Sequence, residues 1–344
     1  MTDDRTNGAP APGDGHGAQR PAVVLANLGT PGAPTPSHVR RFLREFLSDR
    51  RVVETHPLLW RPVLEGVVLR VRPRVVAKKY AGIWTPQGSP LMRYTLRQAE
   101  LLGRRMPDVD VQAAMRYGEP GLGAVLDALH ARGTRRVAVL PAYPQYSATT
   151  VASLNDVAAQ WLRRNRDGFD LRLVRSFPTD PAYIDALASA LESHWGRCGR
   201  PDFAAGDAVV VSFHSIPEAM DRAGDPYRSE CMGTVSALEA RLGLARGALT
   251  VAFQSVFGPA AWLGPATIDT VTRLGSQGCA RLDVICPGFM ADCLETLEEI
   301  DQLNREAFTR AGGSGFHYVP WGNDSEGAVS ALAEQARTAV AGWV

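Results

Sequence analysis

The strongest constraint on the fold of this chain is that its two halves repeat one local plan. The segments VVLANLGTP (Val23 to Pro31) and VVVSFHSIP (Val209 to Pro217) are both an apolar strand that runs into a turn ending in proline. A second pair, VAVLPAYPQYS (Val137 to Ser147) and LDVICPGFMAD (Leu282 to Asp292), joins a strand to a proline and to the polar start of a helix. The repeat predicts two similar units.

Short β-branched runs alternate with stretches of helical periodicity from Pro21 onward, which is typical of parallel sheets flanked by helices. The predicted class is α/β. The eight expected strands are Ala22 to Ala26, Val109 to Met115, Val137 to Leu140, Leu171 to Val174, Ala208 to Ser212, Leu249 to Phe253, Leu282 to Ile285 and Phe316 to Val319. The first helix is expected after Thr35, because Thr35 can cap it and Pro36 suits its first turn.

The repeat also suggests how the chain divides. Residues 21–170 are expected to form an N-terminal domain, residues 171–320 a C-terminal domain, and residues 321–344 a helix that packs back on the body. Residues 1–20 are rich in glycine, proline, aspartate and alanine, so they are predicted to form a disordered tail.

The first half carries an insertion. Pro31 and Pro141 are 110 positions apart, whereas Pro217 and Pro287 are 70 apart, so the first half has about 40 extra residues. They lie at about 49–90 and include PLLWRPVLEGVVLRVRP, in which apolar residues are interleaved with arginines. One interpretation is a helix packed on the core. The other is an apolar lip beside a cleft, which could also rest on a membrane.

Composition argues against several classes of protein. The 37 lysines and arginines nearly balance the 36 aspartates and glutamates, and there is no long basic run, so nucleic-acid binding is not expected. Five cysteines without a CxxC pair fit a reducing compartment, so the cytoplasm is the expected location. No GxGxxG, Walker A or GxSxG motif occurs in a fitting context, which argues against nucleotide chemistry and serine hydrolysis.

Residues at the carboxyl ends of the repeated strands should face one crevice, because parallel sheets bind ligands at that edge. These residues are Asn27, Leu28, Tyr143, His214, Cys286, Asp292 and Glu295. An imidazole such as that of His214 can exchange protons near neutral pH, although a structural role is the alternative. The other histidines, including His194 and His317, are expected to be structural.

An acidic row follows the last of these strand ends. In ADCLETLEE, Asp292, Glu295 and Glu299 fall at helical i, i+3, i+7 spacing, which predicts one shared face. These carboxylates could simply stabilise the start of a helix. Alternatively, they could escort a divalent cation and relay protons.

Four cysteines leave two interpretations open. They are Cys231, Cys279, Cys286 and Cys293. Reduced, partly buried thiols are favoured, because cluster ligands usually include closely spaced pairs. The alternative is a two-iron two-sulfur cluster bound by some of them. No obligatory cofactor is expected.

Eight segments together resemble the ferrochelatase family: NLGTP, FLSDRRVV, GSPL, YPQYS, HSIP, GDPY, FQSVFGPAAWLGP and CPGFMADCLETLEE. They occur in family order from about Pro21 to the C-terminus. The resemblance implies two Rossmann-like domains with a porphyrin in the cleft between them. It also implies a lyase that inserts ferrous iron into the porphyrin as the last step of heme biosynthesis.

The resemblance assigns roles to individual residues. His214 matches the family's invariant histidine and Glu295 its catalytic glutamate, so both are expected to be catalytic and to contact the metal. Asp292 and Glu299 match further acidic residues and are expected to relay protons or metal. Residues expected to contact the porphyrin are Leu28, Arg116, Tyr117, Tyr143 and Trp262. The insertion matches the family's active-site lip, which guides the porphyrin in membrane-associated members.

Two positions depart from some relatives. Cys293 stands where some have histidine, so a metal path through that histidine is not expected. Leu28 stands where relatives acting on coproporphyrin have tyrosine, so protoporphyrin IX is the expected porphyrin. There are three alternatives: iron insertion into coproporphyrin III, a cobalt or nickel chelatase, and a tetrapyrrole carrier without turnover. The expected partners are protoporphyrin IX and Fe²⁺, with the chain a monomer or homodimer that contacts the inner membrane face peripherally through the lip.

Overall fold

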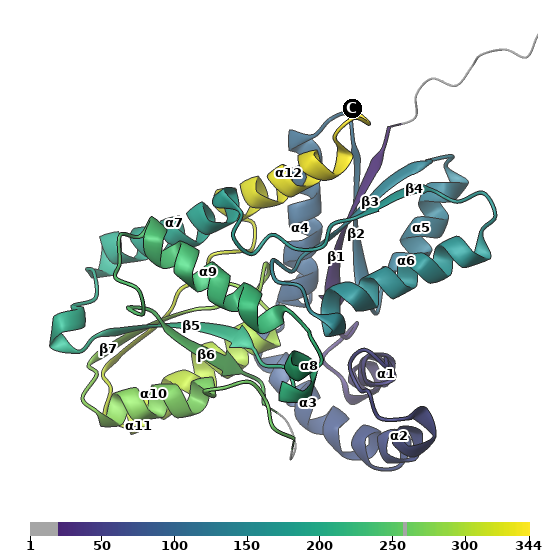
Figure 1. Ribbon diagram of the computed structural model, residues 1–344. Coiled ribbons are helices and arrows are strands. Elements are labelled where there is room, and N and C mark those ends of the chain that lie inside the picture. Colours follow the sequence, from purple (N-terminus) through teal and green to yellow (C-terminus); the bar gives the residue numbers. More distant parts are fainter. Residues whose placement is uncertain (1–19, 257–259) are drawn as a thin grey trace, which may run out of the picture.

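Two four-stranded parallel sheets form the framework of the protein in a computed structural model that describes residues 20–256 and 260–344 (Figure 1). The first sheet contains β1 (Ala22–Gly29), β2 (Asp110–Tyr117), β3 (Arg136–Pro141) and β4 (Asp170–Leu173). The second contains β5 (Ala208–His214), β6 (Thr250–Gln254), β7 (Arg281–Ile285) and β8 (Gly315–Tyr318). All eight predicted strands are therefore confirmed, with ends shifted by at most a few residues.

The two sheets have the same topology, β2-β1-β3-β4 and β6-β5-β7-β8, and every strand pair within them is parallel. The strands matched in the sequence repeat, β1 with β5 and β3 with β7, occupy corresponding places. The predicted α/β class and the internal repeat are thus confirmed. In such sheets the ligand crevice lies at the carboxyl ends of the two central strands, where the strand order reverses.

Helices cover both sheets. In the first half they are α1 (Pro36–Leu47), α2 (Pro57–Val63), α3 (Leu69–Ile83), α4 (Pro90–Arg105), α5 (Leu122–Ala131) and α6 (Ser153–Arg164), with π-helical turns η1 (Leu64–Val68) and η2 (Ala148–Ala152). In the second half they are α7 (Pro181–Cys198), η3 (Phe203–Ala205, a 3₁₀ turn), α8 (Glu218–Arg222), α9 (Tyr227–Arg241), α10 (Thr267–Ser276), η4 (Glu295–Asn304, a π-helix), α11 (Arg305–Arg310) and α12 (Glu326–Val340).

The first helix begins at Pro36 as predicted, but the capping role expected for Thr35 is wrong. Thr35 occupies the N-cap position without a side-chain bond to the helix backbone. Its hydroxyl instead pairs with Ser37 Oγ at 3.1 Å and with His38 Nδ1 at 2.8 Å. The competing side-chain partners within the first turn explain the difference.

One hydrophobic core joins the two halves. Its buried members include Leu25 of β1, Leu102 of α4, Leu187 of α7, Val211 of β5 and Leu332 of α12. Helix α12 packs on α7, α4 and β3, so the C-terminal segment bridges both halves (Figure 1). The domain boundaries expected from sequence stay a prediction, and residues 1–19 of the expected tail lie outside the described residues.

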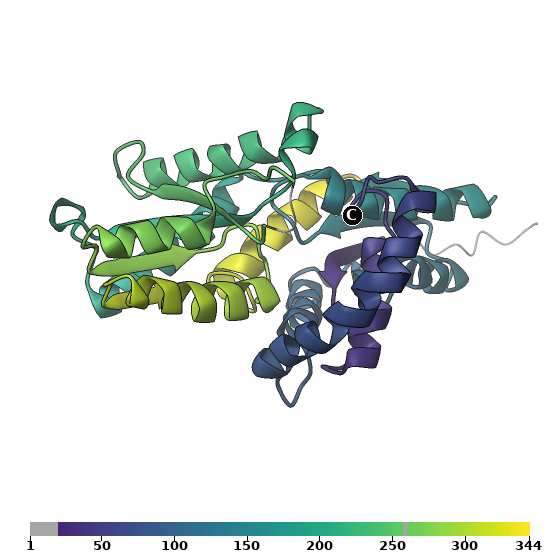
Figure 2. The same cartoon turned by 90° about the horizontal axis from the view of Figure 1, so that it is seen from below.

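The insertion folds into α2, η1 and α3, which pack on α1 (Figure 2). One side of the insertion is buried and the other is exposed, and its position beside a cleft stays a prediction. Leu64, Leu69 and Tyr80 lie in a buried cluster with residues of α1, while Leu58 and Leu59 expose 76% and 70% of their surface. We call residues 57–83 the lip.

Among the described residues, no helix combines the length and the apolar character needed to cross a membrane.

Candidate active site

The carboxyl end of β1 is held tightly against β2. Gly29 pairs with Tyr117 and has a φ of +106°, and a Cβ at this position would lie 1.7 Å from the Tyr117 carbonyl oxygen. Only glycine fits such an approach. The consequence is that Leu28 and Tyr117 are fixed close together, and both pack in the apolar cluster of the lip.

His214 is the last residue of β5, and a backbone contact fixes its tautomer. Its Nδ1 lies 2.6 Å from the Ser215 carbonyl oxygen, which can only accept a hydrogen bond. Nδ1 therefore carries the proton in the neutral ring, and Nε2 is left as the atom that can accept one. The segment that carries Trp262 lies beside this strand end, because Trp262 forms an isolated bridge with Pro217.

Glu295 begins the π-helix η4 next to the same strand end. Gln254 pairs with His214 in the β5–β6 register, and its Nε2 donates to the Glu295 carbonyl oxygen at 2.8 Å. The Glu295 carboxylate lies close to several buried groups. Burial raises the pKa of Cys293, Tyr80 and Tyr143 above their ordinary values, and the negative charge of Glu295 raises each of them further. Glu295 thus lies between β5 and the lip.

Glu299 lies on the same helix as Glu295, and it is close enough to His214 for the two side chains to interact electrostatically. Its carboxylate accepts a hydrogen bond from Ser255 N at 2.7 Å and another from Ser255 Oγ. Burial raises the pKa of Glu299, and the negative charge of Glu295 adds to this, although the Ser255 bonds and His214 oppose it. A carboxyl group with a raised pKa holds its proton closer to neutral pH, which suits proton transfer.

The predicted α-helical spacing of the acidic row is wrong. Residues 295–304 form a π-helix, and Asp292 precedes it. A π-helix is rare and has no separate sequence signature, so α-helix was the natural expectation. The Asp292 carboxylate accepts hydrogen bonds from Tyr318 Oη (2.6 Å), Asn323 Nδ2 (2.7 Å) and Thr296 Oγ1 (2.8 Å). These donors tie it to the body of the second half, and its relay role stays a prediction.

Arg116 and Tyr117 are organised by Asp49, a residue that sequence reasoning did not single out. The Asp49 carboxylate accepts hydrogen bonds from Arg116, from Ser153 Oγ and, at 2.9 Å, from Tyr117 Oη. Burial would raise the pKa of Asp49, but these bonds, a backbone bond from Arg51 and the Arg116 charge together lower it. Asp49 belongs to the family segment FLSDRRVV. Its role could not be seen in the sequence, because its three side-chain partners lie more than 60 positions away along the chain.

Tyr143 lies between the Arg116–Tyr117 pair and the start of η4. Burial raises its pKa well above the ordinary value, and Tyr117, Cys293 and Glu295 contribute in the same direction. Although its hydroxyl is buried, it has no hydrogen-bond partner within residues 20–256 and 260–344. A buried hydroxyl without a partner costs free energy unless a ligand completes it. This is the feature expected of a group that contacts a bound substrate.

The four cysteines lie in different parts of the described fold. Cys279 and Cys286 lie beyond opposite ends of β7, which separates them by roughly 16 Å. Cys231 lies in the core between the halves and Cys293 in a small cluster near the lip. In the part of the chain that the structure describes, none of these four belongs to a group of three or more side chains close enough to share a metal.

The fold and this strand-end site define a two-sheet α/β protein with a histidine, carboxylates and an arginine–tyrosine pair around an apolar wall. The same fold occurs in the structure "SirB from Bacillus subtilis with Fe3+", with a TM-score of 0.54 and 13% identity over 94% of this chain and 96% of that one. This likeness shows the fold alone.

The sequence comparisons then show the family. The ferrochelatase family model matches residues 20–340. The chain is 50% identical to a ferrochelatase of Methylibium petroleiphilum, over 97% of this chain and 92% of that one. It is 47% identical to ferrochelatases of a Polaromonas species (97% and 92%) and an Azoarcus species (96% and 90%). The chain belongs to the ferrochelatase family, the lyases that insert iron into a porphyrin in heme biosynthesis, and its substrates are a porphyrin and a metal ion.

Proposed function

We propose that the chain inserts ferrous iron into protoporphyrin IX at the site formed by His214, Glu295, Glu299, Tyr143 and the Arg116–Tyr117 pair. The observation that carries the proposal is the position of His214, with Nδ1 bonded to Ser215 and Nε2 able to accept a proton beside Glu299. Spectral conversion of protoporphyrin IX to heme by the purified protein and Fe²⁺ under anaerobic conditions tests it. A carrier would bind the porphyrin without conversion.

The reaction exchanges one Fe²⁺ for the two pyrrole N–H protons. In the proposed mechanism His214 Nε2 accepts a pyrrole proton, and Glu295 steadies the iron as it loses water or takes a proton in turn. Glu299 carries protons away, helped by its raised pKa, and Asp292 extends the acidic row. A ring held bent would turn the nitrogen lone pairs out of its plane, which lets iron approach before both protons have left.

Leu28 supports protoporphyrin as the substrate. Its side chain packs in the apolar cluster of the lip with Leu294 and Leu297, which flank Glu295. An apolar wall favours vinyl groups, whereas the extra carboxylates of coproporphyrin need polar partners. We expect Leu28→Tyr to shift the ratio of kcat/KM from protoporphyrin toward coproporphyrin by about tenfold, the size of a changed pocket contact.

The measurement is anaerobic turnover of both porphyrins by the same preparations. Leu28→Phe is the matched control, because it adds the ring without the hydroxyl and should lower turnover of both porphyrins without reversing the preference. An unchanged ratio in Leu28→Tyr would show that this position does not select the porphyrin.

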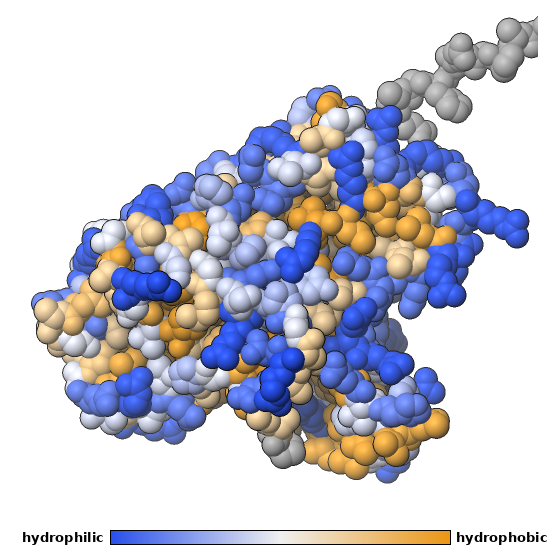
Figure 3. Space-filling view, viewed as in Figure 1, coloured by the Kyte–Doolittle hydropathy of each residue, from blue (hydrophilic) through white to orange (hydrophobic). Residues whose placement is uncertain are grey.

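We also propose that the lip docks peripherally on an anionic membrane, with the body in the cytoplasm. The lip exposes the apolar side chains of Leu58, Leu59, Val63, Val67, Val71 and Val75. Figure 3 shows apolar surface along the lower edge of the molecule, where the lip lies. Arg61, Arg70, Arg74 and Lys78 are exposed in the same segment. An apolar surface accompanied by cations suits the interface of a bilayer with anionic headgroups.

Substitution of Leu58 and Leu59 by serine is expected to weaken binding to phosphatidylglycerol-containing vesicles by at least about tenfold, since each leucine contributes on the order of 1 kcal/mol or more when buried. Co-sedimentation with vesicles measures this. The matched control is serine at Leu173 and Met232, which expose 39% and 45% of their surface outside the lip. Equal binding of both double variants would contradict lip docking.

The oligomeric state expected from the sequence, a monomer or a homodimer, stays a prediction.

A further inference from the structure

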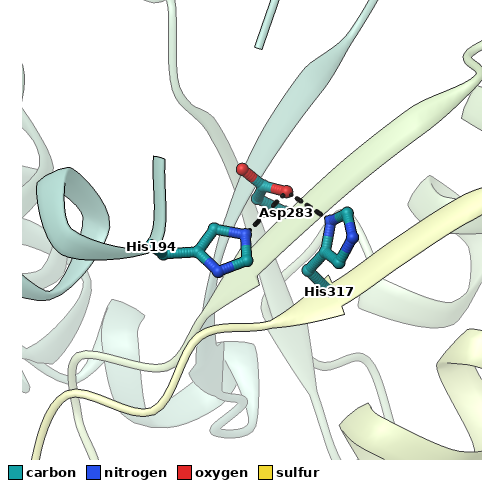
Figure 4. A group of neighbouring side chains, drawn as sticks. All are labelled: His194, Asp283 and His317. Atoms are coloured by element: carbon teal, nitrogen blue, oxygen red, sulfur yellow. Dashed lines mark hydrogen bonds and ion pairs between the residues drawn. The ribbon is translucent and has the colours of Figure 1, made fainter. Parts of the chain in front are cut away.

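A buried group of two histidines and one aspartate lies outside the candidate active site. His194 comes from α7, Asp283 from β7 and His317 from β8 (Figure 4). His317 Nδ1 donates to Asp283 Oδ1 at 2.9 Å, and His194 Nε2 lies 3.5 Å from the same oxygen. The potential ligand atoms of all three residues lie within 4.8 Å of one another.

These separations are close to those of a metal site. Zinc bound tetrahedrally at 2.0–2.1 Å places neighbouring ligand atoms about 3.3 Å apart. The two distances to Asp283 Oδ1 lie on either side of that value, and the two histidine nitrogens lie within 4.8 Å of each other. Two imidazoles and one carboxylate form a ligand set typical of borderline divalent ions, above all zinc.

His194 provides a second, independent observation. It exposes only 8% of its surface, and its buried Nε2 makes no well-formed hydrogen bond among the described residues; it has only the 3.5 Å contact with Asp283 Oδ1. A nitrogen of this ring is directed toward Asp283 (Figure 4), which places it where a shared ion would lie.

Asp283 is oriented by donors that surround it. Its Oδ2 accepts from Trp195 Nε1 at 2.8 Å, and Arg281 donates to both oxygens at 3.1 Å. Its Oδ1 also accepts from His317, so both oxygens of Asp283 are held in place by hydrogen bonds. Such surrounding donors are typical of ligating carboxylates. The positive charge of Arg281 disfavours a second cation next to Asp283. To bind a metal ion, Asp283 Oδ1 must also give up its hydrogen bond from His317.

We propose that His194, Asp283 and His317 bind a divalent transition-metal ion of the zinc type as a resident ion, separate from the iron substrate. The metal takes the place of the proton between His317 and Asp283, so His317 either loses that proton or holds it on Nε2. His317 keeps 34% of its side chain exposed, which gives the ion access and leaves a fourth position for water. The bound ion links α7 to β7 and β8.

Zinc titration of the purified protein against a chromophoric zinc chelator tests the proposal. Because His214 could itself bind zinc, His214→Ala is the starting protein, and it is expected to retain one zinc equivalent. In that background His317→Asn and His194→Asn are each expected to weaken zinc binding by more than the about 10- to 100-fold that loss of a residue outside the ligand set costs. His130→Asn is the control, because His130 also lies beside an aspartate, Asp167.

Cobalt binding gives a readout that does not depend on stability. The His214→Ala protein with Co²⁺ should show the visible absorption of a four-coordinate site with nitrogen ligands, and His317→Asn should lose it while keeping its far-ultraviolet circular dichroism. His317 is the more exposed ligand, so this variant is the one expected to fold. Zinc affinity and cobalt absorption that are the same in His317→Asn as in the starting protein would overturn the proposal.

Discussion

Replacing His214 with alanine is expected to lower iron insertion by about 10² to 10⁴-fold while porphyrin binding persists. His214 Nε2 is the proton acceptor that the Ser215 contact prepares, and general-base catalysis by one side chain contributes about 10² to 10⁴-fold to a rate. Turnover of protoporphyrin and Fe²⁺, followed anaerobically by absorption, should fall by that factor. Porphyrin affinity, followed by fluorescence quenching, should change little, because the arginine–tyrosine pair and the apolar wall remain.

A histidine outside the site provides the control for this variant. His130 packs against Trp161 and Phe169 near the end of α5, which leads to the amino end of β3, so His130→Ala removes the same chemical group away from the carboxyl ends that form the site. Its turnover should stay near that of the unchanged protein. Near-normal turnover in His214→Ala would show that another group accepts the pyrrole proton.

The strands and the meeting of their ends could be predicted from the sequence because both depend on local signals. A buried parallel strand is a short apolar run, and parallel pairing places the carboxyl ends at one edge. The repeat of NLGTP in HSIP therefore predicted that His214 and Leu28 belong to one crevice, and β1 and β5 occupy corresponding places in the two sheets.

Other features could not be predicted because they depend on contacts distant in sequence or on subtle backbone geometry. The same letters describe an α-helix and the π-helix that carries Glu295 and Glu299. Asp49 meets Arg116 only when the end of α1 reaches the end of β2. His194 and His317 were expected to be structural, because a single sequence gives no sign that α7 and β8 bring them to the same carboxylate.

Replacement of Asp49 by asparagine is expected to destabilise the protein by about 3 kcal/mol at neutral pH. Asp49 and Arg116 expose only 9% and 17% of their side chains, and removing one partner of a buried ion pair costs about 3–5 kcal/mol. Asparagine also turns an N–H₂ group toward Arg116, Ser153 or Tyr117, which all donate to the carboxylate. Urea unfolding followed by circular dichroism measures the loss.

The pH dependence of this loss separates charge from shape. The pKa of Asp49 is lower in the folded state than in the unfolded chain, so its stabilisation is fully present above the unfolded pKa of about 3.9 and disappears as the pH falls through the folded value. The difference between the native protein and Asp49→Asn should therefore be constant above about pH 5 and shrink in more acidic solution.

Asp156→Asn is the matched control, because Asp156 also pairs with an arginine, Arg51, but exposes 45% of its side chain. An exposed pair contributes at most about 1 kcal/mol, and salt screens it. The Asp156 variant should lose little stability, and that loss should fall with added salt, whereas the Asp49 loss should resist salt. If both variants lose equally little, Asp49 does not hold Arg116 and Tyr117 in place, and the porphyrin side of the site must be organised by packing alone.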